Sequence, residues 1–146
     1  MTLAELIPVL QTAVGPVVLV SGVGLLIISL TNRLGRVVDR GRNLASDLRE
    51  IPKGKHPSID VQLQILSRRA HLLRRSIVYS VLCVLFAAVL IIVLFLTAAF
   101  GIESAWLVGS LLVLFVCTLG SLVLSLIDFL RELNQALIAF HMDIEQ

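Results

Sequence analysis

The chain has 146 residues and a formal net charge of +2, and 58% of its residues are hydrophobic while only 15% are charged. Soluble domains are nearer half apolar and a quarter charged, so this composition excludes an ordinary soluble protein. Three runs, 7–30, 77–102 and 104–127, carry no charged side chain, and each reaches the roughly 20 residues needed to cross a bilayer. The sequence therefore predicts an all-α membrane protein with one domain over 1–146.

The first run predicts a transmembrane helix over about 7–30. The sequence before it, MTLAELIP, contains Glu5 but no Lys or Arg, whereas a signal peptide begins with a basic segment and has a shorter apolar stretch. We therefore interpret this run as a span that is retained.

The segment 32–76 holds eleven of the twelve basic side chains. Positive residues near the ends of spans stay in the cytoplasm, so we expect this segment and the C-terminus inside and the N-terminus outside. A basic surface beside a membrane typically meets anionic lipid head groups. Because no nucleic-acid-binding motif accompanies the charge, we expect no nucleic-acid partner.

Apolar or small residues recur at steps of three and four outside the charge-free runs, which predicts helices that continue beyond the membrane. The first series is Leu30, Leu34, Val37, Gly41, Leu44, Leu48 and Ile51; the second is Ile59, Leu63, Leu66, Ala70, Leu73 and Ile77; the third is Leu126, Leu130, Leu133, Leu137, Phe140 and Ile144. Prolines and a glycine within 51–57 separate the first two. We expect a cytoplasmic helical hairpin over 32–76 and a cytoplasmic helix over 128–145, packed as a stalk or bundle.

The remaining spans are predicted over about 77–100 and 106–127. The turn between them contains only Glu103 as a charged residue, which places it on the outer side of the membrane, opposite the cytoplasm. Phe100 and Trp106 then fall at the outer interface, where aromatic rings are favoured. Just past the third span, Asp128 and Arg131 have the spacing of an ion pair on one helix.

The sequence carries no recognisable reaction centre. Cys83 and Cys117 form no zinc or redox motif, and the three histidines are scattered. No phosphate-binding loop, catalytic serine or pair of carboxylates is present. No charged residue lies deep in a span, which is where the ionisable residues of proton relays and ion pathways are found. We therefore expect no enzyme activity, no metal and no cofactor.

A stripe of mostly small or polar residues follows one face of the first helix through the span and beyond it. Its members are Gln11, Gly15, Val18, Gly22, Leu25, Ser29, Asn32, Arg36 and Arg40. One interpretation is a pore wall in a homo-oligomer, with an apolar middle and a basic inner mouth. The other is helix packing, since small residues let helices approach closely in lipid. Both interpretations stay open.

Cys117, Ser121 and Ser125 form a second repeat of small residues, spaced four apart on the third span. This spacing favours a contact face for another helix.

The segments LTNRLGRVVDRGRNL (30–44) and LSRRAHLLRRS (66–76) resemble a family of small bacterial inner-membrane proteins described only as a domain of unknown function. The resemblance covers most of the chain and is carried by arginine spacings. It implies three spans and a bacterial source, and it implies no activity.

Two function classes follow from these observations. The first is a homo-oligomeric ion-conducting pore lined by the first helix. The alternative is a non-conducting membrane scaffold or accessory subunit whose cytoplasmic stalk binds a partner protein.

Overall fold

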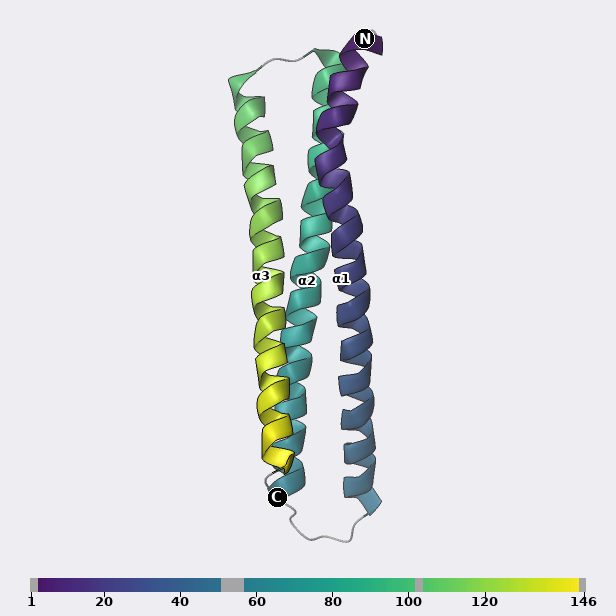
Figure 1. Ribbon diagram of the computed structural model, residues 1–146, viewed down its shortest axis with the longest axis vertical. Helices are drawn as coiled ribbons and strands as arrows, with labels where there is room; N and C mark the ends of the chain where they lie inside the picture. Colours follow the sequence, from purple (N-terminus) through teal and green to yellow (C-terminus); the bar gives the residue numbers. More distant parts are fainter. Residues whose placement is uncertain (1–2, 51–56, 102–103, 145–146) are drawn as a thin grey trace. The chain divides into compact units, whose positions relative to one another are not determined.

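A computed structural model describes residues 3–50, 57–101 and 104–144, and its regular elements are three α-helices. They are α1 (Leu3–Glu50), α2 (Pro57–Phe100) and α3 (Ala105–Ile144), as Figure 1 shows. Each contains a segment long and apolar enough to cross a membrane. The prediction of an all-α membrane protein with three transmembrane helices is confirmed.

The helix ends follow the local sequence. α1 ends at Glu50 and α2 begins at Pro57, on either side of the predicted break; proline is well suited to a first helical turn because it lacks an N–H. α2 ends before Gly101, whose φ of 61° is in the left-handed region that favours glycine. At the start of α3, the Ser104 carbonyl accepts bonds from the amides of Leu107 at 2.9 Å and Val108 at 3.3 Å.

The chain forms two compact units, and each of the three helices contributes a segment to both. The apolar unit contains Met1–Ile27 and Tyr79–Leu124, and the polar unit contains Ile28–Val78 and Ser125–Gln146. The single domain over 1–146 stays a prediction.

The core of the apolar unit consists mainly of small side chains. The buried residues are Ala13, Val23, Ser80, Cys83, Ala87, Leu90, Thr118 and Ser121. Lipid tails are as apolar as leucine, so burial itself does little to hold helices together in a membrane, and close packing of small residues matters more.

The polar unit buries leucines on two helices and carboxylates on the third. Leu30 and Val37 on α1 and Leu73 on α2 are buried, as the first two apolar series predict. The third series predicts a helix that continues past the span, and α3 does continue to Ile144; of its leucines, Leu133 is half-buried, but Leu130 is 60% exposed and Leu137 is 63% exposed. Asp128 and Glu132 are buried in their place.

The reason for this reversal is the distribution of charge on the neighbouring helices. The cations that pair with the carboxylates of α3 come from α1 and α2. A carboxylate is stable in a buried position only with such partners, so α3 turns its acidic face inward, and Leu130 and Leu137 are exposed. Phe140 and Ile144 lie outside the residues whose side chains are described.

Candidate functional site

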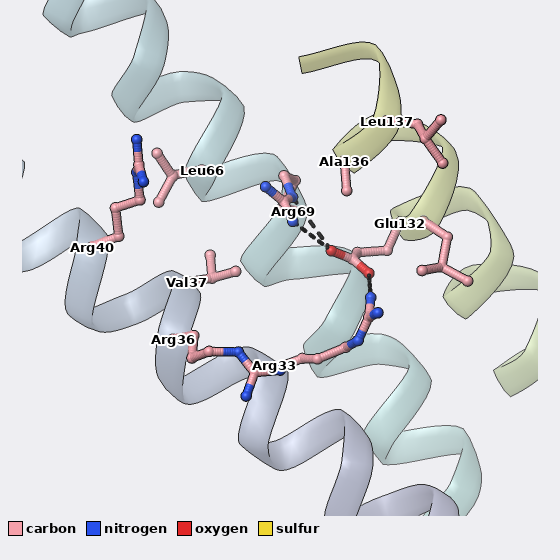
Figure 2. A pocket seen from close by; sticks show the side chains of 10 residues that line it. Arg33, Arg36, Val37, Arg40, Leu66, Arg69, Glu132, Ala136 and Leu137 are labelled. Carbon is pink, nitrogen blue, oxygen red and sulfur yellow. Dashed lines mark hydrogen bonds and ion pairs between the residues drawn. The ribbon is translucent and has the colours of Figure 1, made fainter. Parts of the chain in front are cut away.

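Glu132 is the centre of the polar unit, with only 1% of its side chain exposed. Arg33 of α1 donates from Nη1 to Oε2 at 3.0 Å. Arg69 of α2 donates to Oε1 from Nη2 at 2.9 Å and from Nε at 3.3 Å. Figure 2 shows both arginines converging on the carboxylate. Charge-assisted bonds of this kind offset the cost of removing the carboxylate from water, so one side chain joins three helices.

Aromatic contact further restrains one of these arginines. The Cζ atom of Arg33 lies 5.3 Å from the centre of the Phe129 ring, close enough for a cation–π interaction. A guanidinium held by a carboxylate and by a ring has little rotational freedom left. The donors of Arg33 that Glu132 does not use therefore have fixed directions.

Asp128 forms a second ionic contact one helical turn before Glu132. Nε of Arg75 on α2 lies 3.4 Å from its Oδ2, and Nη1 of Arg131 lies 3.7 Å from its Oδ1. The pair with Arg131 is the one expected from the spacing on α3, and it is confirmed. The pair with Arg75 connects α3 to α2.

A reciprocal serine contact joins the same two helices. The Ser76 hydroxyl donates to the Ser125 carbonyl at 2.7 Å, and the Ser125 hydroxyl donates to the Ser76 carbonyl at 2.9 Å. Both side chains are fully buried. Small hydroxyl residues bring helix backbones close while satisfying their own polar groups, so this contact fixes the spacing of α2 and α3.

A cavity of about 450 Å³ opens beside Glu132 in the polar unit. It is lined by Arg33, Arg36, Val37, Arg40, Leu66, Arg69, Glu132, Leu133, Ala136 and Leu137 (Figure 2). Four arginines thus face one carboxylate, which gives the cavity a positive excess. Arg36 and Arg40 form no ion pair with a carboxylate of the described residues.

The chemistry of this lining suits an anion better than a cation. Both nearby carboxylates, Asp128 and Glu132, are already engaged by arginines. Over the described part of the chain, no three His, Cys, Asp or Glu side chains gather as metal ligands would. Guanidinium groups, by contrast, are donors only.

The two arginine-rich segments that build this site also carry the resemblance to a family. Residues 13–142 match the model of a family described as "Protein of unknown function (DUF2721)". The chain belongs to this family. The match includes most of the first span, all of the other two and every ionic contact described above, and it confirms the resemblance seen in the sequence. No curated protein and no solved structure matches the chain.

The stripe predicted on the first helix of this family member consists of exposed positions. All nine positions, from Gln11 to Arg40, are exposed, whereas Ala13, Val23 and Leu30 of the same helix are buried. A Cβ atom added at Gly15 or Gly22 would meet no other atom within 4 Å. Packing within one chain therefore does not require these glycines. Arg36 and Arg40 are the two stripe positions that also line the cavity.

The small-residue repeat of α3 is divided between exposed and buried positions. Cys117 is exposed, whereas Ser121 and Ser125 are buried. The Ser121 hydroxyl donates to the Thr118 carbonyl of α3 at 2.9 Å, whereas Ser125 bonds Ser76 of α2. Of these two bonds, the one at Ser125 joins α3 to the neighbouring helix of the same chain.

Four residues of the site, Arg33, Arg69, Asp128 and Glu132, are absent from the predicted site residues. A signal for the two carboxylates exists in the sequence. Continued past Ser121 and Ser125 by steps of three and four, the repeat on the third helix reaches Asp128 and then Glu132. Along this face of the third helix the side chains change from small to acidic. The basic residues of the segment 32–76 supply the partners of the two carboxylates.

Proposed function

We propose that this protein self-associates in a membrane and that copies of α1 line an ion-conducting pore. The observation that carries the proposal is the exposure of the whole stripe from Gln11 to Arg40. Polar groups such as those of Gln11 and Ser29 are poorly placed against lipid. A second copy of the same helix would cover them, and several copies around an axis would enclose a path.

The order of residues along the stripe supports conduction over simple packing. Gln11 and Ser29 are polar, while Val18 and Leu25 form an apolar middle, of the kind that gates channels by dewetting. Arg36 and Arg40 add positive charge at one end. A ring of arginines at a pore mouth favours anions over cations.

Charge distribution also supports an orientation. The basic polar unit belongs in the cytoplasm, where it forms the helical stalk on the inner face of a bacterial plasma membrane. Its arginines there meet anionic lipid head groups. The N-terminus is then outside and the C-terminus inside. We assign the protein no catalytic activity and no cofactor.

The test is ion flux through purified protein in vesicles, with Leu25 replaced by Ser. A polar residue at this 71% exposed position hydrates the apolar middle and is expected to raise basal conductance about tenfold, which corresponds to a barrier lower by about 1.4 kcal/mol. Val17→Ser is the matched control: Val17 is 50% exposed but lies roughly 100° around the helix from Val18. It should leave conductance unchanged.

The alternative is a non-conducting scaffold, and one observation favours it. Leu130 and Leu137 are exposed on α3 in the polar unit, where a partner protein would find an apolar face. Wild-type and Leu25→Ser proteins that remain folded oligomers and give no flux would reject the pore and leave the scaffold.

A further inference from the structure

The cavity beside Glu132 has the charge and the size of a binding site. We infer that it binds a phosphate group, presented either by an anionic lipid head group or by free phosphate. The inference does not depend on whether the stripe of α1 conducts, because it rests on the polar unit alone.

The first observation is a built arrangement of donors. Glu132 is buried and holds Arg33 and Arg69 by hydrogen bonds of 2.9 to 3.3 Å. These bonds use only part of the N–H groups that each guanidinium carries. The carboxylate therefore fixes two planar guanidinium groups whose residues line the cavity, and such groups match the oxygens of a phosphate in pairs.

The second observation is the uncompensated charge at the rim. Arg36 and Arg40 on α1 line the same cavity, are exposed, and pair with no carboxylate of the described residues. Their separation by four residues places them one turn apart on the same face. An anion in the cavity would therefore meet two fixed arginines and two adaptable ones.

The third observation is the character and position of the remaining wall. Val37, Leu66 and Leu133 make part of the lining apolar, and about 450 Å³ is enough for a phosphate with an organic substituent. Arg33 follows the last residue of the charge-free run, Leu30, by three positions, or about 4.5 Å along the helix. The head-group layer extends roughly 5 to 7 Å beyond the hydrocarbon core on each side, so a lipid is the source that we expect for this phosphate.

The experiment measures thermal unfolding of the full chain in detergent with two kinds of probe. Dioleoyl phosphatidic acid is compared with dioleoyl phosphatidylcholine at equal mole fraction, and inorganic phosphate is compared with chloride at equal ionic strength. Phosphatidic acid is expected to raise Tm saturably by about 5 °C. A rise with inorganic phosphate as well would support a soluble source for the same group.

Two double variants distinguish binding in the cavity from a general attraction of anions to a basic protein. Replacing both Arg36 and Arg40 by Gln removes the rim charges without exposing Glu132, and it should weaken the response to phosphatidic acid about tenfold in concentration. The control replaces Arg42 and Arg68 by Gln. Both are exposed and outside the cavity, and the same charge is lost.

The control pair should leave the response unchanged. The inference is overturned if neither phosphatidic acid nor inorganic phosphate raises Tm. It is equally overturned if the two variant pairs lose the response to the same extent, since the attraction would then be diffuse. Neither readout involves conductance, so the outcome is separate from that of the pore.

Discussion

The side chains buried in the apolar unit are mostly small ones such as Ala13, Cys83 and Ala87, whereas the polar unit buries Asp128 and Glu132 against arginines. Their cavities differ in the same way. The apolar unit has one of about 250 Å³, lined by residues that include Pro16, Leu19, Leu90 and Phe115, and the polar unit has the arginine-lined cavity of about 450 Å³.

This difference shows two ways of fixing the distance between the same three helices. In lipid, association depends on close approach and short-range packing, because apolar burial gives little net gain. Where arginines crowd the helices, a buried carboxylate can hold two of them at once and set the spacing through charge. The helices of this chain are held by close packing in the apolar unit and by buried ion pairs in the polar unit.

The largest expected effect comes from Glu132. Glu132→Gln removes the charge that Arg33 and Arg69 share and should lower the free energy of unfolding by about 3 kcal/mol, measured by denaturant unfolding in detergent. Asp39→Asn is the control, because Asp39 is exposed and its change should stay within about 0.5 kcal/mol. Equal stability of the two variants would show that the ion pairs do not hold the polar unit.

A pair of leucine truncations sharpens the comparison between the units. Leu73 in the polar unit and Leu90 in the apolar unit are both buried. Leu73→Ala should cost about 3 kcal/mol if this unit stands in water. Leu90→Ala should cost about 1 kcal/mol in a bilayer, where mainly packing is lost. Similar losses for both variants would place the two units in the same solvent.

The smallest effect concerns the serine contact. Ser125→Ala removes the bond to the Ser76 carbonyl and should cost about 0.6 kcal/mol in the same unfolding assay. Ser110→Ala is the control, since Ser110 is exposed and bonds only within α3, to the Leu107 carbonyl at 2.8 Å. A loss above about 2 kcal/mol for Ser125→Ala would mean that this contact, and not the ion pairs, fastens α2 to α3.

Local features of the sequence determined the three spans and the ends of the helices. The length of a charge-free run decides by itself whether the run can cross a bilayer. Gly101 and Pro57 influence only the backbone next to them, and so they mark the helix ends. The apolar series of α1 and α2 also predicted Leu30, Val37 and Leu73, all of which are buried.

Only the tertiary structure decided which face of α3 is buried and that the stripe of α1 is exposed. Leucine spacing pointed one way on α3 and the small-to-acidic series pointed the other, and the choice depended on Arg69 and Arg33, which lie 63 and 99 residues from Glu132. A carboxylate is costly or stabilising in a buried position according to its partners. Those partners meet it only when three helices come together.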